Sequence, residues 1–107
     1  MADFKLKQNP TFWRTVALKS LDGEVQSLEL ELRHKTKTAL KAFYDLISSP
    51  EKPSDEDLVL ELVAGWRKVD VEFSRDALLT LMDQYPASAG EIWSDYQAAY
   101  REAARKN

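Results

Sequence analysis

The sequence predicts an α+β fold in which an N-terminal antiparallel β-hairpin, with the option of a third short strand, packs against about four α-helices. Three observations support this. Leu28, Leu30 and Leu32 alternate with polar or charged residues, as in a strand with one buried face. Asp22-Gly23 precedes them, and this dipeptide is typical of tight hairpin turns. Further along, apolar residues recur at helical spacing behind serine or threonine caps.

Length and composition favour a single domain over residues 1–107. A chain of 107 residues that is 44% hydrophobic can bury one core and is too short for two. Within it we expect an arm or edge strand (1–11), the hairpin (12–33) and a helical part (36–107).

The chain has no cysteine, which excludes disulfides and thiolate metal sites. It shows no signal peptide and no apolar run of about 20 residues, so a soluble protein is expected.

The net charge of −3 is unevenly distributed. Residues 1–50 carry eight Lys/Arg against six Asp/Glu, which gives +2, and residues 51–107 carry seven against twelve, which gives −5. A negative C-terminal half repels nucleic acid. The opposite halves could let copies associate head to tail, although ordinary solvated faces are the simpler interpretation.

The first 21 residues indicate an arm followed by a strand. Phe4 is the expected anchor of the arm, which ends at an Asn-Pro turn signal. The segment 12–21 is rich in Val, Thr and aromatic residues, which favour a strand. Val16 and Leu18 share one face of it and Trp13 lies on the opposite face.

The second strand is predicted over 25–33, where the leucine alternation is clearest. Val25 is out of phase with that alternation. We therefore expect a bulge or a wider turn near Gln26 and Ser27.

Side chains able to cap helices mark four helix starts. Thr36, Ser54 and Ser74 each precede an apolar periodic segment, and Ser88 with Glu91 three residues later forms a capping box for the last helix. Because a two-stranded hairpin is only marginally stable alone, these helices must cover its leucine face.

The stretch from residue 65 to residue 86 begins and ends with a helix-ending residue. Gly65 is expected to end a helix that reaches Trp66, and the segment 69–73 alternates as a half-buried extended segment. Pro86 ends the helix that follows Ser74.

The predicted core combines the apolar faces of these elements. It contains Val16, Leu18, Leu30, Leu32, Leu40, Phe43, Leu62, Trp66, Phe73, Leu78, Leu81, Tyr85, Ile92 and Tyr96. Trp93 and Tyr100 lie beside the inner seam of the last helix, so with Trp13 and Phe4 they are candidate partner-binding residues. Burial is the alternative for each tryptophan.

No catalytic, cofactor-binding or metal-binding set can be assembled, so no enzyme is predicted. His34 is the single histidine and fits an exposed loop or cap. Asp70 and Glu72 could pose as paired carboxylates, but their alternation with apolar neighbours favours a solvated face. A short basic run comprises Arg33, His34, Lys35, Lys37 and Lys41. It lacks interleaved aromatic residues, so a solvated helix start explains it better than nucleic-acid binding.

The order of parts from residue 65 to residue 86 resembles the tail assembly chaperones of long-tailed bacteriophages and prophages. The residues that carry the resemblance are Gly65, Trp66, Val71, Phe73, Ser74, Leu81, Tyr85 and Pro86. The N-terminal Phe-x-Leu segment, the hairpin and the Thr-rich helix start extend it over nearly the whole chain. The run Arg67 to Asp70 replaces the Asp-Gly-type turn that the family often has there.

The resemblance implies a function without chemistry. Members of that family bind the long apolar tape measure protein of the tail, keep it soluble and help tail tube subunits gather around it. It also implies self-association into oligomers, the cytoplasm of a bacterial host, no nucleic-acid or membrane partner, and the short product of a gene with a programmed frameshift. The alternatives are another small tail structural or completion protein and, less favoured, a nucleic-acid-binding regulator.

Overall fold

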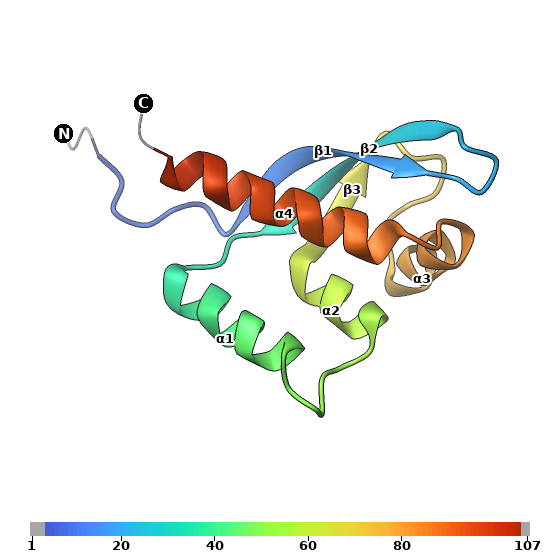
Figure 1. The fold of residues 1–107 in the computed structure, drawn as a ribbon. Helices are drawn as coiled ribbons and strands as arrows, with labels where there is room; N and C mark the ends of the chain where they lie inside the picture. Colours follow the sequence, from blue (N-terminus) through green and yellow to red (C-terminus); the bar gives the residue numbers. More distant parts are fainter. Residues whose placement is uncertain (1–3, 106–107) are drawn as a thin grey trace.

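The computed structural model describes residues 4–105 and confirms an α+β fold (Figure 1). In chain order the elements are β1 (Thr11–Lys19), β2 (Val25–Arg33), α1 (Lys37–Ile47), α2 (Asp55–Leu62), β3 (Val63–Arg67), α3 (Arg75–Gln84) and α4 (Ser88–Ala104). The three strands form one antiparallel sheet in the order β1-β2-β3. The long helix α4 runs across one face of this sheet, and the shorter helices lie on the same side (Figure 1). Within residues 4–105, no helix covers the opposite face of the sheet (Figure 1).

The hairpin is regular from end to end. β1 and β2 pair without interruption from Thr11↔Arg33 to Lys19↔Val25, so the bulge expected near Gln26 is absent. The hairpin instead has the wider turn, the other option for a Val25 that is out of phase with the leucine alternation. In this turn the Ser20 N–H donates to the Glu24 carbonyl (2.9 Å). Three residues separate this pair, and Gly23 has a φ of 90°, a left-handed conformation that suits glycine.

The third strand lies earlier in the chain than predicted. β3 follows α2 without a connecting loop and pairs with β2, with a register irregularity between Glu31 and Leu32. Gly65 is therefore a strand residue, not a helix end, and a Cβ there would lie 3.0 Å from the Glu31 Oε1 atom. A short apolar run such as 63–66 fits a helix end or a buried strand equally well. The open edge of β2 gives it strand partners, which the sequence pattern alone does not show.

The predicted extended segment 69–73 forms no strand. It is a loop in which Val71 is 54% exposed, while the Val71 carbonyl accepts a hydrogen bond from the Trp66 indole (2.8 Å). Phe73 packs edge-on against Trp66, with ring centroids 5.1 Å apart. The aromatic pair thus closes the loop onto β3.

The core lies between the sheet and the helices. Of the residues predicted for it, the buried ones are Val16, Leu18, Leu30, Leu32, Leu40, Phe43, Leu62, Leu78, Ile92 and Tyr96. Trp66, Phe73, Leu81 and Tyr85 are partly buried and pack against this cluster. Leu28, Val59 and Val63 complete it. Within residues 4–105 no helix is long and apolar enough to cross a membrane.

Three of the four predicted helix caps are confirmed. The hydroxyls of Thr36, Ser54 and Ser74 accept hydrogen bonds from backbone N–H groups of the first helical turn, at 3.1, 3.3 and 3.0 Å. These bonds satisfy donors that a helix start otherwise leaves unpaired.

The capping box predicted for the last helix is wrong. Ala87 occupies the cap position of α4 and makes no side-chain cap bond. Ser88 already lies inside the helix and is buried, and neither its hydroxyl nor Glu91 Oε1 has a hydrogen-bond partner among the described residues. Ser88 lies on the same buried face of α4 as Ile92 and Tyr96, which follow it at intervals of four residues.

The N-terminal arm is neither helix nor strand over residues 4–10, which are all exposed. An edge strand is therefore excluded for this part, while residues 1–3 of the predicted arm lie outside the described residues. The His34 N–H donates to the Pro10 carbonyl (2.9 Å), which fixes the arm where it enters β1.

Side-chain hydrogen bonds and ion pairs join α4 to the sheet. The Tyr96 hydroxyl donates to the Arg33 carbonyl (2.8 Å). Arg14 donates through Nε to Asp95 (3.0 Å) and through Nη1 to Glu102 (3.2 Å), and these two carboxylates raise the pKa of the Arg14 guanidinium. A guanidinium fork held by two carboxylates fixes the direction in which α4 crosses β1.

We expect Tyr96→Phe to lower the free energy of unfolding by about 1 kcal/mol, because a part-buried carbonyl loses its donor while the ring still fills the core. Urea denaturation measures this. Tyr100→Phe is the matched control, since the Tyr100 hydroxyl makes no hydrogen bond within residues 4–105, and it should leave stability unchanged. Equal losses in the two variants would contradict the assignment.

Candidate functional site

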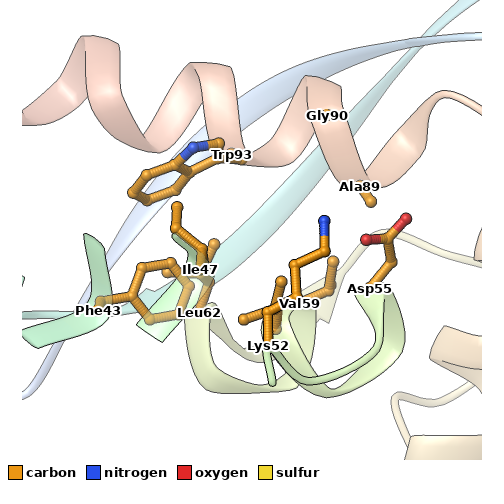
Figure 2. A pocket seen from close by; sticks show the side chains of 10 residues that line it. Phe43, Ile47, Lys52, Asp55, Val59, Leu62, Ala89, Gly90 and Trp93 are labelled. Atoms are coloured by element: carbon orange, nitrogen blue, oxygen red, sulfur yellow. The ribbon is translucent and has the colours of Figure 1, made fainter. Parts of the chain in front are cut away.

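An apolar groove lies between α1, α2 and α4. We call it the helix groove; its volume is about 300 Å³. Its lining consists of Phe43, Ile47, Lys52, Asp55, Leu58, Val59, Leu62, Ala89, Gly90 and Trp93. Figure 2 shows the Trp93 indole of α4 on one side, facing Phe43 and Ile47 of α1, with Lys52 and Asp55 toward one end. The groove is thus an apolar surface with charged groups at one end.

The wall formed by Trp93 is held in place by other aromatic rings. Its ring centroid lies 5.1 Å from that of Phe43, 5.4 Å from that of Tyr44 and 6.1 Å from that of Tyr96, which it stacks on at 20°. Tilted and stacked pairs at these distances are favourable. Trp93 is therefore partly buried: it packs on the core and also lines the open groove.

A cation lies at the Phe43 side of the groove. Lys35 Nζ lies 5.1 Å from the Phe43 ring centroid and 3.8 Å from the Glu61 carboxylate. Lys35 belongs to the basic run that the sequence analysis weighed for nucleic-acid binding. In the structure its charge is paired with a carboxylate and its ammonium lies over an aromatic ring.

The remaining candidate partner-binding residues lie elsewhere. Trp13 is 40% exposed on the helix-free face of the sheet, where the Arg67 guanidinium lies 4.1 Å above its ring centroid. Phe4 is 78% exposed on the arm. Tyr100 is partly buried against the core near the end of α4. The structure therefore does not gather the four residues into one surface, and only Trp93 lines the helix groove.

Charged side chains organise the helix-free face around Trp13. Glu29 accepts from Arg67 (2.9 Å) and forms an ion pair with Lys68 (3.2 Å). Hydrogen bonds from Arg67 and Lys68 hold the pKa of the Glu29 carboxyl below its usual value. Glu29 thereby helps to hold Arg67 over the Trp13 ring.

The polar residues considered for chemistry remain dispersed. His34, Asp70 and Glu72 are exposed, and within residues 4–105 no group of three His, Cys, Asp or Glu side chains could hold a metal ion. The helix groove, by contrast, brings apolar side chains of three helices together around one hollow.

The sequence analysis did not anticipate the helix groove. Ile47, Val59 and Ala89 come from three helices whose relative placement no periodicity reveals. One signal was available: the apolar residues of the segment after Ser54 spread over more than one face. A helix of that kind packs on more than one neighbour, and here α2 contacts both α4 and α3.

The fold and groove define a class: a small α+β protein with an apolar groove between three of its helices. The family model described as phage tail assembly chaperone matches residues 1–107, the whole chain. The chain therefore belongs to the phage tail assembly chaperone family. No curated protein and no solved structure gave a significant match.

Replacing Trp93 and replacing Trp13 should lower the stability of the fold by different amounts. We expect Trp93→Ala to cost about 3 kcal/mol, since it removes a ring in contact with three others. Trp13→Ala should cost less than about 1 kcal/mol, because it removes a surface ring under one cation. Urea denaturation of both variants measures the difference. A larger loss for Trp13 would reverse the assigned roles.

Proposed function

We propose that this chain is a tail assembly chaperone that binds the tape measure protein and keeps it soluble during assembly of a phage or prophage tail. The helix groove is the observation that carries the proposal. Its apolar lining from three helices suits side chains projecting from one face of an amphipathic helix, which is the common way in which grooves bind helical partners.

The size of the groove sets the expected strength of one contact. A volume of about 300 Å³ is at the lower end of ligand pockets and accepts only one or two large side chains. Each site therefore binds weakly and reversibly. A chaperone must release its client, and many copies along one long client compensate for weak single contacts by avidity.

The proposal includes self-association of the chaperone, recruitment of tail tube subunits to the coated tape measure, and action in the cytoplasm of the bacterial host. It includes no catalytic step, cofactor, metal, nucleic acid or membrane. Trp13 on the helix-free face and Phe4 on the arm are exposed outside the helix groove, which leaves surface for contacts with copies of the chain or with tube subunits while the groove holds the client.

The direct test is copurification with the tape measure protein of the same phage or prophage. Ile47→Lys places a charge in the groove lining, and we expect it to weaken client binding at least about tenfold. Leu46→Lys is the matched control, because Leu46 is the neighbouring residue of α1, is 39% exposed and does not line the groove. Both variants should remain folded by circular dichroism.

Two outcomes would contradict the proposal. One is the absence of a complex between the native chain and the tape measure protein. The other is a complex that Ile47→Lys and Leu46→Lys weaken equally, which would place the contact outside the groove.

A further inference from the structure

β1 presents an unpaired edge. It is an outer strand of the sheet. Two backbone hydrogen bonds at its ends show which of its residues bond to β2: the His34 N–H donates to the Pro10 carbonyl, and the Ser20 N–H donates to the Glu24 carbonyl. With the continuous register between them, the even-numbered residues of β1 bond to β2. The N–H and C=O groups of the odd-numbered residues therefore point away from the sheet. These residues are Thr11, Trp13, Thr15, Ala17 and Lys19.

A second groove runs along this edge. We call it the edge groove; it has a volume of about 520 Å³ and is lined by Val16 and Ala17 of β1 and by Ala87, Gly90, Glu91, Ser94, Asp95 and Ala98 of α4. Successive strand residues point to opposite faces, so a hollow lined by both Val16 and Ala17 opens at the strand edge itself. The α4 wall consists mainly of small side chains, which leave room for another backbone beside β1.

The edge groove holds an unsatisfied acceptor. Glu91 Oε1 is buried and has no hydrogen-bond partner among the described residues. The neighbouring carboxylate of Asp95 is already bound by Arg14 through two nitrogen atoms (3.0 and 3.2 Å). A buried carboxylate oxygen without a donor is costly, so a positively charged donor is the group that this site accepts best.

The chain itself contains a segment with the matching pattern. In the arm, Phe4 and Leu6 alternate with Lys5 and Lys7, and the two apolar side chains are 78% and 87% exposed. Alternation of this kind suits a strand that presents apolar groups on one face and cations on the other. The lengths also agree: α4 rises roughly 16 Å between Ala87 and Ala98, and five extended residues span roughly 17 Å.

The arm of the same molecule does not lead toward the edge groove. Pro10 is still in register with β2 through its bond from the His34 N–H, so the chain before it continues past the start of β1. The edge groove lies alongside Val16 and Ala17, in the opposite direction. An arm that fills the groove without reversing must come from another molecule.

We propose that the edge groove binds the N-terminal arm of a second copy of this chain, added to β1 as a fourth strand. Lys5 and Lys7 then point toward Glu91, with their stems over the small residues of α4. Phe4 and Leu6 lie on the helix-free face beside Trp13 and cover part of its exposed ring. This assigns a surface to the self-association that forms part of the proposed function, and its tests leave the client out.

Disulfide trapping tests the contact directly, because the native chain has no cysteine. Leu6→Cys is mixed in turn with Thr15→Cys and with Ala17→Cys, all in the full chain, under mild oxidation. Each variant has one thiol, so a mixed dimer can form only between molecules. We expect the yield of mixed dimer to be at least about tenfold higher than with Val71→Cys, a control at an exposed residue outside the groove lining.

Charge reversal provides the second test. Lys5→Glu with Lys7→Glu should raise the dissociation constant of self-association, measured by analytical ultracentrifugation, at least about tenfold. Mixing the Lys5→Glu, Lys7→Glu variant with Glu91→Lys should restore association between the two proteins. Each of the two variants should self-associate only weakly on its own. Circular dichroism of Glu91→Lys establishes that α4 is intact.

A native chain that stays monomeric would overturn the proposal, as would trapping no better than with Val71→Cys. An intramolecular disulfide in a Leu6→Cys/Ala17→Cys double variant, without mixed dimers from the single variants, would assign the groove to the chain's own arm instead.

Loss of self-association with client binding retained supports the arm contact. Loss of client binding alone would count against the proposed function and leave the arm contact standing.

Discussion

The leucine row on the inner face of β2 is the constraint on which the other contacts depend. Leu28, Leu30 and Leu32 are 8%, 0% and 0% exposed, and burying three leucine side chains contributes roughly 6 kcal/mol. A slip of one residue in the hairpin would move all three to the opposite face. The row therefore fixes the register of β1, the face that the helices cover and, by consequence, the face and edge of the sheet that remain open.

The helix-covered face of the sheet and its helix-free face offer different surfaces for binding. On the covered side, α1, α2 and α4 meet over the sheet and leave the helix groove between them, with Trp93 held by neighbouring rings. On the open side, Trp13 lies under Arg67 and the edge of β1 is unpaired. The proposed client binding and the proposed contacts between copies thus use separate surfaces of one small core.

Local sequence signals predicted most of the fold. The predictions failed where contacts with residues far away in the sequence determine the secondary structure. The hairpin strands and the caps Thr36, Ser54 and Ser74 follow from alternation and from backbone donors within four residues. β3 was missed because the apolar run at 63–66 becomes a strand only through the free edge of β2. Ser88 was misjudged because burial of its own helix face outweighed a local cap. The candidate site was less predictable, since three helices far apart in sequence form the groove.

The central claim is that the client occupies the groove lined by Trp93. Amide hydrogen exchange of the full chain, with and without the tape measure protein, tests it most directly. The account predicts added protection in residues 43–47, 55–62 and 89–93, and unchanged exchange in α3. Protection confined to α3 or to the loop at 69–73, with the groove helices unaffected, would contradict it.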